Sequence, residues 1–155
     1  MPSSKFYETI FRWRDEKLVI GCTNGCFDLL HEGHRHLLSE ARKHCDALAI
    51  IINTDESVKR LKGQGRPIEH LQLRGQNLQS LYPNDPNFCL GTISDERDLL
   101  EYIKIIHPDV LIKGSDYHGL SITGAGYVQK YGGKVVLIPL LPGYSTTKIV
   151  ENQCH

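Results

Sequence analysis

Short apolar runs alternate along this chain with segments in which apolar residues recur at helical spacing. The runs are rich in Val, Ile and Leu, which is typical of strands buried on both faces of a parallel sheet. They comprise residues 17–23, 47–53, 88–92, 109–113 and 134–139. Alternation of strands and helices with short connections favours right-handed crossovers. The pattern therefore predicts an α/β fold, an open parallel five-stranded sheet with helices on both faces.

The composition is that of one ordinary globular domain. The 155 residues include 40% apolar and 23% charged residues, and neither a repeat nor a linker divides them, so we expect a single domain over residues 1–155. Eighteen basic residues balance eighteen acidic ones. This balance gives no general attraction to nucleic acid or to an anionic membrane, and we expect neither as a partner.

The cysteines and the N-terminus indicate the compartment. The five cysteines are Cys22, Cys26, Cys45, Cys89 and Cys154. Their odd number and mostly apolar surroundings favour reduced thiols that pack as small hydrophobic groups. The chain starts with a polar stretch and has no apolar run near the roughly 18 residues of a membrane span. We therefore expect a cytoplasmic protein.

Two histidines follow the first apolar run, within the segment TNGCFDLLHEGHRHLL. Ligands of open parallel sheets bind at the carboxyl ends of the strands, so this segment has the right position for a site. His31 and His34 are three residues apart, on one face of a helix that begins here. They lie beside the unpaired N–H groups of its first turn, and Gly33 lets a phosphate approach the backbone. The pattern predicts stabilisation of a negatively charged phosphoryl group.

Three other interpretations of this segment compete with the first. The two histidines could simply cap the helix. They could bind zinc together with Cys22 and Cys26, although only four residues separate the two pairs and structural fingers separate them by roughly 12–15. A different nucleotide-binding fold is the third, but neither a Walker A motif nor G-x-G-x-x-G occurs in the chain.

The stretch TNGCFDLLHEGH resembles the H-x-G-H signature of the nucleotidyltransferase superfamily. This superfamily includes the glycerol-3-phosphate cytidylyltransferases, and the chain is more similar to the adenylyltransferases that make ADP-heptose from heptose 1-phosphate. Four further segments match in order: residues 53–67, Arg74, residues 107–117 and residues 143–150. The resemblance covers nearly the whole chain and implies a Rossmann-like sheet.

The resemblance implies a reaction as well as a fold. The phosphate of a sugar attacks the α-phosphorus of a nucleoside triphosphate, pyrophosphate leaves, and a nucleotide-activated sugar forms, with Mg²⁺ on the triphosphate. ATP and D-glycero-β-D-manno-heptose 1-phosphate are the favoured substrates. The alternatives are a CTP-dependent enzyme acting on glycerol 3-phosphate or another polyol or sugar phosphate, and a nucleotide-binding module without turnover. Residues 140–143 read Leu-Leu-Pro-Gly where the glycerol-phosphate type carries Arg-Thr-Glu-Gly, which favours the heptose branch. Family members often pair, so a homodimer is a hypothesis.

The resemblance also implies roles for individual residues. His31, His34 and Lys62 would be catalytic, and Lys62 would place its positive charge beside the α- or β-phosphate. Asp28 and Asp116 would contact the substrate, although Asp28 could instead position a histidine or Mg²⁺, and no metal ligand is assigned. The nucleotide-binding residues would be Thr23, Asn24, Gly25, Phe27, Gly33, Arg66, Arg74, Lys113, Gly114, Tyr144, Ser145, Thr146 and Thr147.

Three parts of this assignment have simpler interpretations. Residues 62–67, KGQGRP, contain two glycines, a proline and two cations, which predicts a mobile loop. Its cations could form a solvated basic stretch instead of a phosphate clamp. Arg74 could be a surface residue of a helix, and Phe27 could pack under the turn that follows the first strand.

Overall fold

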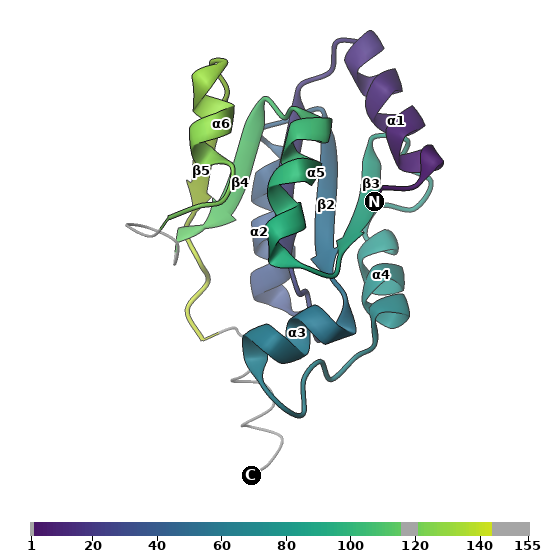
Figure 1. Cartoon of the computed structure of the whole chain (residues 1–155), viewed down its shortest axis with the longest axis vertical. Coiled ribbons are helices and arrows are strands. Elements are labelled where there is room, and N and C mark those ends of the chain that lie inside the picture. Colours follow the sequence, from purple (N-terminus) through teal and green to yellow (C-terminus); the bar gives the residue numbers. More distant parts are fainter. Residues whose placement is uncertain (1, 116–120, 144–155) are drawn as a thin grey trace.

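The computed structural model describes residues 2–115 and 121–143, and its centre is one parallel sheet (Figure 1). The strands are β1 (Ile20–Gly25), β2 (Ala47–Asn53), β3 (Phe88–Ile93), β4 (Val110–Gly114) and β5 (Lys134–Ile138). Their order across the sheet is β3-β2-β1-β4-β5. The predicted fold class is confirmed, and the observed strands begin and end within three residues of the apolar runs.

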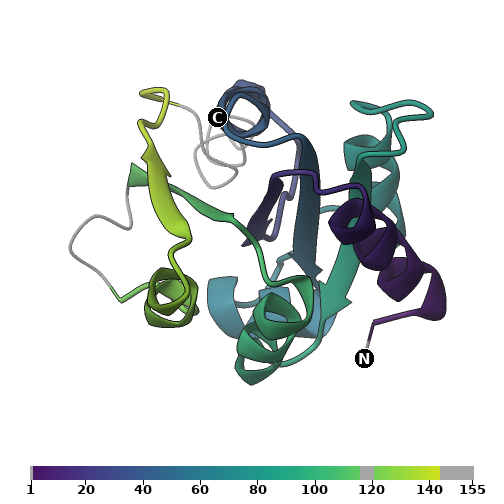
Figure 2. The same ribbon diagram turned by 90° about the horizontal axis from the view of Figure 1, so that it is seen from above.

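Helices cover both faces of the sheet, as Figure 2 shows from above. They are α1 (Ser4–Asp15), α2 (Glu32–Arg42), α3 (Asp55–Lys62), α4 (Leu71–Gln79), a short 3₁₀ helix η1 (Glu96–Asp98), α5 (Leu99–Ile106) and α6 (Ala125–Lys130). Helices α1, α5 and α6 pack on one face, α2 and α4 pack on the other, and α3 lies at the carboxyl ends of the strands (Figure 1). Within the described ranges, no helix has the length and apolar character to cross a membrane.

Each face of the sheet carries its own apolar core. One core includes Trp13 and Ile103, and the other includes Leu38 and Leu78. Strand β2 is buried along its whole length, whereas β3 and β5 are partly exposed. The expectation that every run is buried on both faces is therefore wrong for these two, because each lies at an edge of the sheet and has a neighbouring strand on one side only.

The sheet has a seam between β1 and β4. Strands β1 and β2 pair along six residues, from Ile20 opposite Ala47 onward. Strands β1 and β4 pair at only two positions, the second being Cys22 opposite Leu111. Beyond this point the two strands are no longer paired at their carboxyl ends, where the strand order reverses. This is the position at which open parallel sheets bind their ligands.

Candidate active site

A cavity of about 540 Å³ lies at the carboxyl ends of the strands, around the seam. It collects most of the site residues that the sequence predicted: Thr23, Asn24, Gly25, Phe27, Asp28, His31, Gly33, His34, Lys62, Arg66, Lys113 and Gly114. Asp116, Tyr144, Ser145, Thr146 and Thr147 lie outside the described residues. Arg74 is described, but it does not line the cavity.

The two histidines cap helix α2 for each other. The backbone N–H groups of Gly33 and His34 point to Nδ1 of His31, at 3.1 and 3.4 Å, and the N–H of His31 donates to Nδ1 of His34 at 3.2 Å. The rings stack with their centroids 3.7 Å apart. A backbone N–H can only donate, so each Nδ1 carries a lone pair and each ring proton is on Nε2. Capping and ligand binding are therefore compatible, because they use different atoms of the same rings.

Burial keeps both imidazoles uncharged at neutral pH. Loss of solvent, followed by the neighbouring His31, lowers the pKa of His34 from 6.5 to about 3. Burial also lowers the pKa of His31. The pair thus presents neutral Nε2–H groups, which can donate hydrogen bonds to phosphate oxygens.

Phe27 packs under the turn that follows β1 and also lines the cavity. Its side chain is buried and belongs to the core beneath α2, while the residue also lines the cavity. Its ring centroid lies 5.3 Å from that of His34. The aromatic ring therefore supports the histidine from below, as expected for a residue that packs under the turn.

Cations reach the cavity from both sides of the seam. Lys62 ends α3 and Arg66 follows it in the loop, so both approach from the β2 side. Lys113 comes from β4 and donates a hydrogen bond from Nζ to Oδ1 of Asn24 on β1. This contact crosses the gap where the two strands no longer pair. A polyanion at the histidines would therefore have positive charge on either side.

Thr23 brings a further polar atom to the cavity. Its hydroxyl oxygen is fully buried and has no hydrogen-bond partner within the described ranges. Buried polar groups are normally satisfied, so this hydroxyl is an exception among the described residues.

Asp28 holds the loop that carries Arg66. Its carboxylate accepts hydrogen bonds from Nε of Arg66 at 3.1 Å and from the backbone N–H groups of Ile68 and Glu69 at 2.8 and 2.9 Å. The side chain of Asp28 is fully buried. These contacts fasten residues 66–69 to the turn after β1 and place the guanidinium of Arg66 at the cavity. The role of Asp28 as a substrate ligand stays a prediction.

Arg74 differs from both expectations for it. It is fully buried in α4, so it is neither a surface residue nor a group that faces the cavity. Its guanidinium donates to the carbonyl oxygens of Glu69, Cys26 and Asn53 at 2.7–2.9 Å, and to Oδ1 of Asp55 at 2.7 Å. It therefore connects the ends of β1 and β2, the loop and α3, and it acts on the site by holding the backbone in place.

Sequence reasoning missed several residues that line the cavity, notably Asn53, Glu96, Leu140 and Leu141. Asn53 is the last residue of β2, and Glu96 follows β3 by three residues. Both positions lie at the carboxyl ends of strands, and this placement could have identified them as candidate site residues. Leu140 and Leu141 were considered only as departures from a motif.

The fold and the cavity define the class of this protein: an α/β domain with its candidate site at the switch point of a parallel sheet. More narrowly, the chain belongs to the cytidylyltransferase-like family, whose model matches residues 22–152. It is 45% identical over 97% of its length to the bifunctional protein HldE of Hyphomonas neptunium, and 48% identical over 92% of its length to that of Acidiphilium cryptum. The chain spans only 30% and 29% of these two relatives.

Solved structures share the fold. A lipopolysaccharide core biosynthesis protein from Thermoplasma volcanium matches with a TM-score of 0.61 and 24% identity, over 80% of this chain and 97% of the other. A pantoate-beta-alanine ligase from Francisella tularensis matches with the same TM-score and 18% identity, over 94% of this chain and 70% of the other. At these identities the likeness concerns the fold alone.

Proposed function

We propose that this chain is a nucleotidyltransferase that transfers AMP from ATP to D-glycero-β-D-manno-heptose 1-phosphate, forming an ADP-activated heptose and pyrophosphate. The observation that carries the proposal is the stacked histidine pair, which caps α2 at the cavity with both Nδ1 atoms engaged. Membership of the cytidylyltransferase-like family supports the class of reaction. The similarity to the HldE proteins supports the heptose branch.

The chemistry follows from donors that are already in place. An oxygen of the sugar phosphate forms a bond to the α-phosphorus, while the bond from that phosphorus to the leaving pyrophosphate breaks. The nucleophile is an anion at neutral pH, so the protein needs neither a covalent intermediate nor a strong base. The Nε2–H groups of His31 and His34 donate to oxygens of the α-phosphoryl group as negative charge gathers there, and Lys62 and Lys113 neutralise it from either side.

Mg²⁺ enters this proposal as part of the nucleotide substrate. The described residues contain no cluster of three His, Cys, Asp or Glu that could hold a metal ion. Cys22, considered as a zinc ligand with Cys26 and the histidines, packs instead in the core on the α1 side. Mg²⁺ commonly binds through substrate phosphates with few protein ligands, and this role fits the donor set of the cavity.

The proposal is tested by measuring pyrophosphate release with Mg²⁺. ATP, CTP, GTP and UTP are each paired with heptose 1-phosphate, glycerol 3-phosphate and other sugar phosphates. We expect signal with ATP and heptose 1-phosphate. Signal confined to CTP with a polyol phosphate would support nucleotidyl transfer but refute ATP and heptose 1-phosphate as the substrates. Nucleotide binding without release for any acceptor would refute turnover.

A histidine variant tests the mechanism with the same assay. Loss of one preorganised donor to a developing oxyanion typically lowers kcat by about 100- to 1000-fold, and we expect this for His34→Ala. The matched control is His36→Ala, since His36 lies on the same helix and is absent from the cavity lining. Unchanged turnover of the His34 variant would remove this histidine from the mechanism.

A further inference from the structure

Helix α3 carries Lys62 as its last residue, where little of the surrounding protein touches it. The helix is eight residues long, and its buried residues are Ser57 and Val58, both in its first half. Its last turn is exposed. Gly63 and Gly65 follow, and a Cβ at either would meet no atom of the described residues within 4 Å. The place of Lys62 in the cavity therefore depends on contacts made near the start of the helix.

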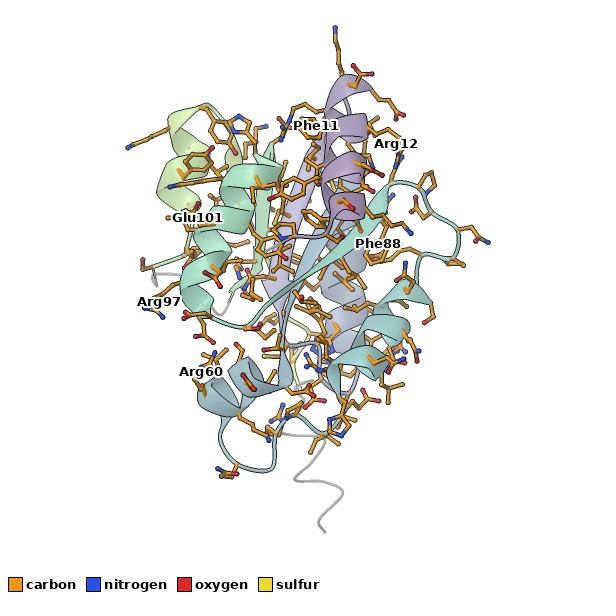
Figure 3. All side chains as sticks on the ribbon, turned by 45° about the vertical axis from the view of Figure 1, so that its right-hand side comes forward. Phe11, Arg12, Arg60, Phe88, Arg97 and Glu101 are labelled. Atoms are coloured by element: carbon orange, nitrogen blue, oxygen red, sulfur yellow. The ribbon has the colours of Figure 1, made fainter. Side chains whose placement is uncertain are left out.

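One face of α3 is attached to the segment that follows β3. The attachments come from residues three positions apart, which lie along one face of a helix; they are Thr54, Ser57 and Arg60. Their acceptors, in the same order, are the carbonyl oxygen of Ile93, Oε1 of Glu96 and the carbonyl oxygen of Ser94. In Figure 3, Arg60 of α3 lies below Arg97 of η1. Lys62 is five residues on from Ser57, which turns it by about 140° around the helix, so it projects from a different face and lines the cavity.

Ser57 makes the buried attachment of this face. Its side chain is fully buried, whereas that of Arg60 is 51% exposed. The hydroxyl of Ser57 accepts a hydrogen bond from the amide nitrogen of Asn53 at 2.8 Å and donates one to Oε1 of Glu96 at 2.5 Å. The bond from Ser57 lowers the pKa of Glu96, so the acceptor is a carboxylate at neutral pH. Hydrogen bonds to an ionised acceptor are about twice as strong as neutral ones.

The orientation of Asn53 is fixed from its other side. Sγ of Cys26 donates to Oδ1 of Asn53 at 4.0 Å, so the amide nitrogen of Asn53 faces Ser57. A chain of hydrogen bonds thus runs from the turn after β1, through the end of β2 and α3, to η1. Displacement of Ser57 would deprive a buried amide of its acceptor, which is costly. The chain therefore holds α3 against the strand ends that form the cavity.

We propose that Ser57 is a positioning residue: its hydroxyl fixes α3 against the ends of β2 and β3 and thereby determines where the charge of Lys62 lies in the cavity. Ser57 does not line the cavity itself, so it acts through Lys62. This inference rests on the proposed function, because it takes Lys62 as a cation that meets the phosphates of the nucleotide.

A double-mutant cycle between Ser57 and Lys62 tests the assignment. The wild type, Ser57→Ala, Lys62→Met and the double variant are compared by kcat/KM for ATP. Lys62→Met should lower this value by about 100- to 1000-fold, as expected for loss of one preorganised charge. Misplacement by about 1 Å can cost about 100-fold, and the flexible lysine side chain recovers part of it, so Ser57→Ala should cost about 10-fold. In the Lys62→Met background, Ser57→Ala should change the value less than about twofold, because no charge is left to misplace.

The KM for heptose 1-phosphate distinguishes positioning from a general loosening of the cavity. A helix that misplaces one cation near the triphosphate should leave this KM within about twofold of the wild-type value. A merely structural role of Ser57 would raise the KM for both substrates, and its effect would be the same with and without Lys62.

The matched control is Ser80→Ala. Ser80 lies at the C-terminal end of α4, where its hydroxyl donates to the carbonyl oxygen of Asn77 at 2.6 Å in an exposed place outside the cavity lining. Its substitution should change neither kcat nor either KM. Melting temperatures show whether each variant is folded. If Ser57→Ala does not fold, Glu96→Ala takes its place in the cycle, since it removes the same hydrogen bond from a side chain that is 43% exposed.

Four results would overturn the assignment. They are an unchanged kcat/KM for ATP in a folded Ser57→Ala protein, an equal loss in the Lys62→Met background, an equal rise in the KM for heptose 1-phosphate, and a Ser80→Ala effect as large as that of Ser57→Ala.

Calorimetric titration with ATP separates this assignment from the proposed function. If the wild-type protein releases no pyrophosphate, the proposed function fails, and the same cycle is measured as the Kd for ATP. Weaker ATP binding to Ser57→Ala that disappears in the Lys62→Met background would still support the positioning of Lys62 by Ser57. Equal binding to Ser57→Ala and the wild type, or none to the wild type, overturns it.

Discussion

Replacing Arg74 with lysine should destabilise the protein strongly, although the charge is retained. The guanidinium donates to three backbone carbonyl oxygens and one carboxylate on separate segments, all within 2.7–2.9 Å. An ammonium group donates from a single point and cannot reach acceptors spread around a planar fork. We therefore expect about two of the four acceptors, which are buried or half-buried, to lose their partner.

The magnitude follows from the cost of unsatisfied buried groups. Each orphaned acceptor costs about 1–3 kcal/mol, so the free energy of unfolding should fall by about 3 kcal/mol. For a chain of this length, this corresponds to a melting temperature lower by about 6–12 °C. The single tryptophan, Trp13, is fully buried and reports unfolding by its fluorescence, and circular dichroism gives a second probe of the same transition.

The matched control is Arg97→Lys. The side chain of Arg97 is 89% exposed and pairs with Asp95, so its replacement should change stability by less than about 0.5 kcal/mol. Melting of Arg74→Lys within about 2 °C of the wild-type protein would refute the structural role assigned to Arg74. Normal stability with a raised KM for ATP would instead restore the expectation that this arginine faces the triphosphate.

His34 and Gly91 give the remaining predictions. In spectra of ¹⁵N-labelled histidine, His34 should show the Nε2–H tautomer and no titration from pH 8 to 5, with the signal assigned from His34→Ala; titration near pH 6.5 would contradict its burial. Because folding lowers the pKa of His34 from 6.5 to about 3, the unfolded state binds more protons between these values, and His34 makes stability rise with pH in that window. Gly91→Ala should lower the free energy of unfolding, measured with urea, by about 1–3 kcal/mol. The reason is that the new Cβ would lie 2.7 Å from Tyr102 and 2.9 Å from Ile51. A smaller loss would mean that these two side chains can move aside.

The sequence allowed the sheet to be predicted because its signal is local. An apolar run marks each strand. The site was predicted at the carboxyl ends of β1 and β4, because open parallel sheets bind their ligands there. The pairing of His31 with His34 could be predicted as well, since they are three positions apart at the start of one helix.

The contacts of Asp28, Arg74 and Glu96 could not be predicted in the same way. The partners of Asp28 and Arg74 include residues about 40 to 50 positions away in the sequence, and Ser57 and Glu96 are 39 apart. Sequence shows that a residue is charged, but its function here depends on whether the fold buries it against backbone or exposes it to the cavity. Arg74 illustrates the difference, because its match to a family position said nothing about its burial.

The seam in the sheet has a thermodynamic consequence. Strands β1 and β4 share two paired positions, so the half-sheet β3-β2-β1 and the half-sheet β4-β5 have little backbone pairing between them. A polyanion held by His34 on one side and Lys113 on the other would supply cohesion that the strands lack there. Its binding would then raise the free energy of unfolding, as for any ligand that binds only the native state. A polyanion bound across the seam would then do part of the work that hydrogen bonds between strands do elsewhere in the sheet.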